Sequence, residues 1–401
     1  MSAVFKVEPR LQAVMAQQYP RFSDAEYARR QAALAAAMEK HGCDHLLVVT
    51  DHRAGNAVQW LTGWPGTVEA YVVFKPGERM VMHMEWFNHF PLGRKIARDV
   101  DVRWGQHQGI ALTIEELKRR GAKRIGLIGP LVLSKCRQLE AAFEVKLLDA
   151  DYTQLRMRKS AEEIDWLRIG AALSDAGLRA LVAGTRVGMD ERELGALVES
   201  AYVKHGGTTM IHYIGVTSMA QPHIYVPPQH PSPRKVQAGD VIFCELSAFW
   251  WDYPGQILRT FTVDADPTPR YADLHATAEA TFDAVTKVLR HGATMQEIMD
   301  ELEEKTKDIK GASIEFFPPP SVPRHQSRRD GRPEGRRLQG GERRPAAEHG
   351  LRRHHRPDQP AGAECHHRVR ARRRGRPRLC GGGRRGARPF RAHQPVQPAD
   401  P

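Results

Sequence analysis

Residues 223–259 contain the side chains whose types suit proton transfer and the binding of a polar substrate. His223 lies in a proline-containing loop, and an imidazole, which titrates near neutral pH, can take or give a proton there. Glu245 lies in an apolar run, where a carboxylate must be paired or face a cavity. The sequence therefore predicts His223 as a catalytic acid/base, and the candidates for substrate binding are Glu245, Gln256, Arg259 and Tyr253.

Each candidate also has a purely structural interpretation. His223 can be an exposed loop histidine without a catalytic role. Glu245 can form an ion pair with Arg259, and Gln256 can satisfy backbone groups between strands. Tyr253, which follows two tryptophans closely, can pack in a core or an interface instead of lining a pocket.

Capping and strand signals predict the elements that position these residues. Helices are expected to begin at capping boxes, which pair Ser23 with Glu26, Thr113 with Glu116, Ser160 with Glu163 and Asp190 with Glu193. Short apolar runs alternate with helices over residues 20–150, which predicts an α/β domain with a hairpin over 71–82. An α+β unit is expected from Ser160 onward, with strands Val241–Leu246 and Gln256–Val263 and helices over 271–290 and 294–307.

The composition is typical of a globular protein outside the membrane. Of the 401 residues, 41% are hydrophobic and 27% are charged, and no run of about 18 apolar residues occurs. The first residues lack the basic and apolar segments of a secretory signal. The five cysteines have no metal-ligand spacing, so reduced thiols are expected. These features predict a cytoplasmic protein with no membrane contact.

The last 81 residues differ in kind from the rest. Residues 321–401 carry 22 Arg and seven acidic residues, a net charge of +15, whereas residues 1–320 carry a net charge of −2. Only seven of the 81 are Leu, Ile, Val or Phe, too few for a core. The segment also lacks Lys, Ile, Met, Asn, Thr, Tyr and Trp, whose codons all begin with A or T. We therefore hypothesise a frameshift in a GC-rich gene between Lys310 and Val322; the alternative is a genuine disordered basic tail.

Several segments in order resemble the creatinase/aminopeptidase P/prolidase family, the pita-bread hydrolases. The matching segments are Arg158–Ile164, Pro222-His223, Gly239–Ile242 and Arg259–Phe261. The resemblance covers roughly residues 20–310 and depends on the order and spacing of the segments, because no single motif is specific. It implies an N-terminal α/β domain followed by an α+β pita-bread domain, here incomplete, and then the basic tail.

The resemblance also implies how the site differs from that of the family. Members usually hold two divalent metals on two Asp, one His and two Glu, and the two Asp positions correspond here to Glu245 and Gln256. The remaining ligands are expected after about residue 310, where the sequence shows no strand pattern. We therefore expect no metal and no cofactor. Creatinase works without a metal through a histidine, and that role falls on His223, whereas Leu258 replaces the glutamate that holds its guanidinium substrate.

The expected domains are 1–155 (creatinase/prolidase-like), 156–310 (first half of the pita-bread domain) and 311–401 (basic tail). The first functional hypothesis is a metal-free hydrolase, impaired in this chain, that acts on a small C–N-bonded substrate, either a peptide or an amidine. The second is a truncated, non-catalytic family member. The third, least favoured, is a nucleic-acid binder, because the Arg clusters lack interleaved aromatic residues for base stacking. A homodimer is implied by the resemblance alone.

Overall fold

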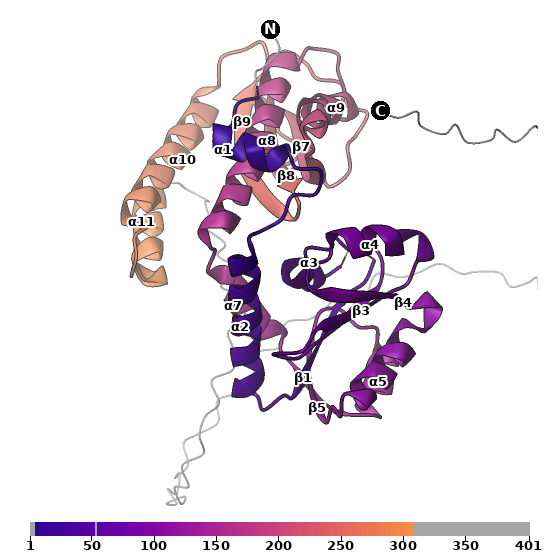
Figure 1. Ribbon diagram of the computed structural model, residues 1–401. Helices are drawn as coiled ribbons and strands as arrows, with labels where there is room; N and C mark the ends of the chain where they lie inside the picture. Colours follow the sequence, from indigo (N-terminus) through magenta and orange to yellow (C-terminus); the bar gives the residue numbers. More distant parts are fainter. Residues whose placement is uncertain (1–4, 53, 308–401) are drawn as a thin grey trace, which may run out of the picture. The chain divides into compact units, whose positions relative to one another are not determined.

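The computed structural model describes residues 5–52 and 54–307. These residues belong to one compact unit and contain two β-sheets (Figure 1). The Arg-rich segment and the proposed frameshift lie outside the described residues.

The first sheet has six strands in the order β4-β3-β2-β1-β5-β6. Neighbouring strands are parallel, except that β2 runs antiparallel to both β1 and β3. The expected hairpin is confirmed as β2 and β3, and the α/β pattern of residues 20–150 forms this single sheet. The strands are β1 (His45–Thr50), β2 (Ala70–Phe74), β3 (Met80–Met84), β4 (Val100–Trp104), β5 (Arg124–Ile128) and β6 (Glu144–Leu147).

Helices cover both faces of the six-stranded sheet, which explains why its central strands are apolar on both sides. Leu46 and Val48 point into a core shared with α2, α3, α4 and α7. Leu47 and Val49 point into a second core, shared with α5 and α6. The helices are α2 (Asp24–Lys40), α3 (Ala57–Thr62), α4 (Phe90–Ile96), α5 (Gly109–Arg119), α6 (Leu133–Glu140) and α7 (Asp149–Met157), with short 3₁₀ turns at Phe87–His89 and Gln106–Gln108.

The second sheet has three antiparallel strands in the order β7-β8-β9. They are β7 (Thr208–Ser218), β8 (Asp240–Trp250) and β9 (Tyr253–Thr262), so β7 is a strand that the sequence patterns did not predict. One face packs on α8 (Ala161–Gly184) and α9 (Glu191–Tyr202) through Ile242, Cys244 and Leu246. A 3₁₀ turn at Val203–His205 leads from α9 into β7.

Three further helices complete the described chain. Helix α1 (Pro9–Met15) packs on α8 through Leu11. The two expected C-terminal helices are confirmed as α10 (Pro269–Val288) and α11 (Met295–Thr306), which pack on each other. Within the described ranges, no helix has the length and apolar character needed to cross a membrane.

Two of the four expected capping boxes are confirmed in full, those at Ser160 and Asp190. The Ser23 side chain accepts the Glu26 N–H at 3.2 Å, but the Glu26 carboxylate binds Arg29 and Arg30 instead of closing the box.

The capping box expected at Thr113 is wrong. Helix α5 begins at Gly109, and the Thr113 hydroxyl donates to the Gly109 carbonyl at 2.7 Å inside the helix. The Glu116 carboxylate accepts hydrogen bonds from three arginines instead of from a helix N-terminus, and these bonds lower the pKa of its carboxyl to about 2. A serine or threonine followed three residues later by glutamate therefore also occurs in mid-helix, where i−4 hydrogen bonding satisfies the hydroxyl.

Candidate functional site

The alternation of β8 and β9 places Glu245 and Gln256 together on one face of the three-stranded sheet. In the antiparallel register, Glu245 lies opposite Leu258, and Gln256 lies opposite Ser247. These positions alternate with the core residues and therefore lie on the face away from α8 and α9. Gln256 Nε2 donates a hydrogen bond of 2.5 Å to Glu245 Oε1. We call this pair and its surroundings the open face.

His223 is held on the same side of the sheet by Thr217 of β7. The His223 backbone N–H donates to Thr217 Oγ1 at 3.0 Å, and His223 Nδ1 lies 2.8 Å from that oxygen. Thr217 is fully buried, and its hydroxyl can accept the backbone N–H while it donates its own proton to Nδ1. In that arrangement, the neutral ring carries its proton on Nε2.

The open face is elongated. Thr217 pairs with Val241, which lies four residues along β8 from Glu245. At roughly 3.4 Å per residue, the two ends of the site are about 14 Å apart along the strands. Side chains that extend toward each other shorten this distance.

Arg259 lies on the opposite face of the sheet. It pairs with Cys244, whose side chain points into the core with α8, and burial raises the pKa of that thiol to about 11. The Arg259 guanidinium donates to the Leu258 carbonyl at 2.8 Å. The interpretation of Glu245 as an ion-pair partner of Arg259 is therefore wrong, because strand alternation directs the two side chains to opposite sides.

Tyr253 belongs to a buried junction centred on Glu163. The Tyr253 hydroxyl donates to Glu163 Oε1 at 2.9 Å, and Trp60 Nε1 donates to the same oxygen at 3.2 Å. Arg30, only 1% exposed, lies 3.2 Å from that oxygen and donates to the Trp60 carbonyl at 2.7 Å. Burial raises the pKa of Tyr253, so its hydroxyl stays a neutral donor. The structure thus places Tyr253 in a core and away from Glu245.

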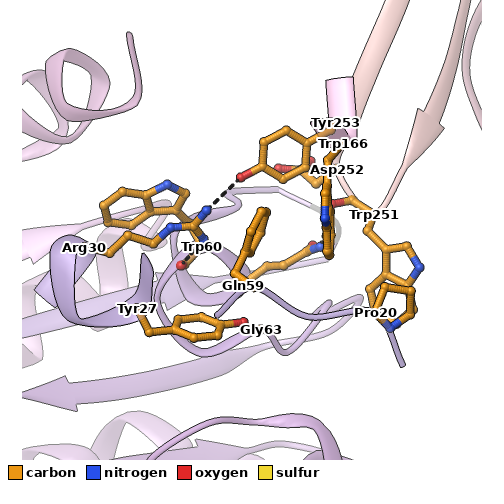
Figure 2. A pocket seen from close by; sticks show the side chains of 11 residues that line it. Pro20, Tyr27, Arg30, Gln59, Trp60, Gly63, Trp166, Trp251, Asp252 and Tyr253 are labelled. Carbon is orange, nitrogen blue, oxygen red and sulfur yellow. Dashed lines mark hydrogen bonds between the residues drawn. The ribbon is translucent and has the colours of Figure 1, made fainter. Parts of the chain in front are cut away.

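Figure 2 shows the pocket beside this junction, with Arg30 and Tyr253 pointing toward each other. Aromatic rings from α2, α3, α8 and the β8–β9 turn line it. Its cavity has a volume of about 10 Å³, which is room for one water molecule at most. The pocket is therefore a small gap between packed elements and is too small for a substrate.

The turn between β8 and β9 is anchored beside the same junction. Trp251 and Asp252 both have positive φ angles, 45° and 73°, in a two-residue turn that normally favours asparagine and glycine. Gln59 Nε2 donates to the Trp251 carbonyl at 2.9 Å, and Arg156 lies 3.6 Å from the Asp252 carboxylate, whose pKa is raised by burial. These contacts hold a strained turn and thereby fix the hairpin that carries the open-face pair.

The two positions that the resemblance assigns to metal-binding carboxylates do not fit a pair of metals. The Gln256 amide nitrogen donates to Glu245, so this position supplies a hydrogen-bond donor where a bridging carboxylate is needed. Among residues 5–52 and 54–307, no cluster of three or more His, Cys, Asp or Glu side chains could hold a metal ion. The other ligands expected after about residue 310 lie outside the described residues.

Sequence reasoning missed Thr217 and the strand that carries it. Residues 208–218 contain threonines, a glycine and a histidine among apolar residues. These residues obscure the alternation of apolar and polar positions that is typical of a strand. A bulge between Thr209 and Ile211 also interrupts the alternation. The one available signal was the short spacing of six residues between a threonine and the candidate histidine.

Comparison with known proteins identifies the fold. Residues 165–319 match the model of metallopeptidase family M24. The X-Pro aminopeptidase of Thermotoga maritima has a similar structure, with a TM-score of 0.59 at 19% identity over 69% of this chain and 77% of that one. The Xaa-Pro dipeptidase of Bacillus anthracis gives 0.60 at 20% identity over 70% and 77%. Dipeptidase PepE of Mycobacterium ulcerans gives 0.59 at 23% identity over 72% and 78%.

The order of elements, the three-stranded sheet on α8 and α9, and the family match agree with the resemblance found in the sequence. The chain therefore has the pita-bread fold of these peptidases, and its residues 165–319 are similar to metallopeptidase family M24.

Proposed function

We propose that this chain is a metal-independent hydrolase of the Xaa-Pro peptidase type, impaired in the present sequence, that acts on a short peptide. The hydrogen bond from Gln256 to Glu245 carries the metal-free part of the proposal. It joins the two positions where the family places metal-binding carboxylates, and one of these positions is a neutral amide. A peptide fits the separation of His223 from this pair better than a compact amidine does.

His223 is the proposed acid/base. Because the Thr217 hydroxyl can rotate, it donates to Nδ1 of the neutral ring and accepts from Nδ1 of the protonated ring. The same partner therefore supports both states that proton transfer requires. In the tautomer whose Nδ1–H donates to Thr217, Nε2 takes a proton from the water that adds to the peptide carbonyl carbon. The protonated ring then gives this proton from Nε2 to the leaving nitrogen as the C–N bond breaks, which returns the ring to its neutral state.

Glu245 and Gln256 are the proposed substrate-binding groups. The Glu245 carboxylate can accept a hydrogen bond from the substrate or bind its ammonium group. Gln256 can accept a hydrogen bond through Oε1 while its Nε2 donates to Glu245. Tyr253 and Arg259 stay candidates from the sequence only, and their place on the other face favours a structural role for both.

The impairment is proposed from the C-terminal sequence. The family match ends at residue 319, between Lys310 and Val322, where the composition changes. This agreement supports the frameshift hypothesis. Resequencing codons 300–330 and translating all three frames tests it: a frame that continues with Gly, His and Glu in strand-like segments supports the hypothesis, and three frames without one contradict it.

A non-catalytic family member is the second candidate, favoured by the same Gln256 amide. The two candidates separate in one assay, the hydrolysis of Ala-Pro by the full chain with and without Mn²⁺. We expect slow hydrolysis that Mn²⁺ does not stimulate and that His223→Ala abolishes. Replacement of His230, another histidine of the same loop, by alanine is the matched control and should leave the rate unchanged.

Each other result decides between the candidates. Stimulation by Mn²⁺ contradicts the metal-free mechanism. Binding of Ala-Pro without turnover supports the non-catalytic candidate. Sedimentation of the same sample tests the proposed homodimer, and DNA binding that disappears when residues 321–401 are deleted would support the nucleic-acid hypothesis.

A further inference from the structure

Helix α10 carries an exposed apolar stripe. The residues of this stripe are Leu274, Ala278, Phe282, Val285 and Leu289, and their spacing of three or four residues places them on one side of the helix. Phe282 is 71% exposed, Leu289 is 65% exposed and Leu274 is 39% exposed. Apolar side chains that are exposed together, rather than singly, indicate an interaction surface. We call these five residues the α10 stripe.

Helix α11 packs on a different side of α10 (Figure 1). The less exposed positions of α10 are Thr277, Thr281, Ala284 and Val288. At 3.6 residues per turn, these positions are centred about a quarter of a turn away from the α10 stripe. Among the described residues of the two helices, Ala284 is the only buried one. The α10–α11 pair therefore leaves the α10 stripe available to another partner.

The α10 stripe is complementary to a reversed copy of itself. Its midpoint lies beside Phe282, because Leu274 and Leu289 are equally far from that point, as are Ala278 and Val285. In an antiparallel pair of α10 helices related by a two-fold axis, Leu274 would lie opposite the partner's Leu289, and Ala278 opposite the partner's Val285. The two Phe282 side chains would meet beside the axis.

The charges along α10 favour the antiparallel arrangement over the parallel one. Residues 269–283 contain three acidic residues and one arginine, whereas residues 284–290 contain Lys287 and Arg290 and no acidic residue. An antiparallel pair places the acidic part of each helix beside the basic part of the other and also aligns the two helix dipoles favourably. Arg290 binds Glu297 of α11 at 2.7 Å, so Lys287 contributes most of the excess positive charge.

The Arg-rich end of the chain is a poor match for this surface. Of residues 321–401, 22 are Arg and only seven are Leu, Ile, Val or Phe. A segment with so few apolar residues cannot fill five consecutive apolar positions of a helix. A second copy of α10, in contrast, supplies the same apolar stripe and the opposite order of charges.

We propose that the α10 stripe is a homodimer interface, in which α10 packs antiparallel on α10 of a second copy of this chain. The two α10–α11 pairs then form a four-helix assembly. The inference gives the proposed homodimer a surface and does not rest on the proposed hydrolase activity.

Sedimentation equilibrium of the full chain measures the association, and Phe282→Asp tests the surface. The change should weaken the dimer at least about a hundredfold, because the two-fold axis places the substitution in the interface twice. Phe282 is exposed in the single copy, so the far-UV circular dichroism should stay the same. Phe87→Asp is the matched control and should leave the dimer intact, because Phe87 is 60% exposed but precedes α4.

Cysteine cross-linking tests the direction of the pairing. A mixture of Leu274→Cys and Leu289→Cys chains should form a disulfide-linked dimer under mild oxidation. Leu274→Cys alone should not exceed the background of the unmodified chain, which has five cysteines of its own. In the antiparallel dimer the two copies of this position are about 22 Å apart along the helices, too far for a disulfide.

Each contrary result has a distinct meaning. A monomer at about 100 μM overturns the interface and leaves residues 308–320 of the same chain as the candidate occupant. A dimer that Phe282→Asp does not weaken shows that the interface lies elsewhere, whatever the outcome for peptide hydrolysis. Self-cross-linking of Leu274→Cys well above the background contradicts the antiparallel arrangement.

Discussion

The two sheets of this protein differ in how their faces are covered, and that difference determines where polar side chains occur. Helices pack on both faces of the six-stranded sheet, whose strands β1 and β2 are fully buried. In the three-stranded sheet, α8 and α9 cover one face, while Leu258 on the other is 61% exposed. The Glu245 carboxylate and the Gln256 amide lie on this second face.

The charged side chains of the junction and of the open face also differ in how many hydrogen-bond partners they have. The junction between them buries Arg30 and Glu163, but Tyr253, Trp60 and Glu26 give both groups partners. On the open face, Glu245 has one strong donor, Gln256. A buried charge requires several fixed partners, whereas a half-exposed charge needs few and can exchange one for a ligand.

The largest expected effect comes from breaking the junction. Glu163→Gln removes a carboxylate that accepts from three elements and leaves Glu26 as the one carboxylate beside Arg30, so the free energy of unfolding should fall by about 3 kcal/mol. Urea unfolding measures it. Glu39→Gln on the exposed side of α2 is the control and should stay within about 0.5 kcal/mol. A loss below about 1 kcal/mol for Glu163→Gln would show that the junction is unimportant.

His83, in the six-stranded sheet, should make the free energy of unfolding depend on pH. The pKa of His83 is about 4 in the folded chain and about 6.5 when unfolded, so the unfolded state binds more protons between these values. This contribution is complete above pH 6.5 and is lost as the pH falls toward 4.

Between pH 7 and pH 5 the expected loss is about 2 kcal/mol. Arg103, Asp101 and Glu116 face the ring, and the low pKa of Glu116 keeps its carboxylate charged in this window. Urea unfolding at both pH values, compared with His83→Gln, measures the effect. An equal pH dependence in both proteins would assign it to other groups.

Tyr253→Phe tests whether Tyr253 is structural. The change removes hydrogen bonds to Glu163 and Arg30, so the free energy of unfolding should fall by about 1 to 2 kcal/mol while binding of Ala-Pro stays the same. Tyr213→Phe on the open face is the control, with an expected change below about 0.5 kcal/mol. Weaker peptide binding with unchanged stability would restore Tyr253 as a substrate contact.

Gln256→Glu gives the smallest effect and tests the open face. It places two carboxylates where an amide now donates to Glu245, and their repulsion raises the pKa of the pair. At pH 7 the unfolding free energy should fall by about 1 kcal/mol, and the loss should shrink as the pH falls through the raised pKa.

The matched control for this change is Gln296→Glu, which puts a carboxylate beside Asp300 on the exposed helix α11 and should lower stability by about 0.3 kcal/mol. Thermal melts at pH 7 and pH 5 measure both variants. If Gln256→Glu is as harmless as its control at pH 7, the hydrogen bond to Glu245 contributes little.

Much of the fold was predictable because its signals are local. The Ser160 capping box begins α8, and the turn at Pro76-Gly77 joins β2 to β3. The Thr113 prediction failed because the same short pattern occurs inside a helix. Strand β7 was missed because a bulge and polar residues obscure its alternation.

The candidate site was less predictable, because its residues meet across strands. The sequence predicted a loop at His223 and strands at Glu245 and Gln256, as the structure has them, but did not indicate Thr217, which holds His223. It also grouped Arg259 with Glu245, although the two lie on opposite faces. Strand alternation separates them, and that follows only once the register of β8 and β9 is known.

The sequence by itself determined the resemblance to the pita-bread hydrolases, most of the order of elements and the change in composition after residue 310, because periodicity, caps and codon bias are properties of consecutive residues. Only the tertiary structure decided which side chains are partners. Tyr253 bonds Glu163 from 90 residues away, and Gln256 rather than Arg259 pairs with Glu245. Those choices depend on strand register and on helices that pack from distant parts of the chain, and the energies of such contacts arise only when the whole core assembles.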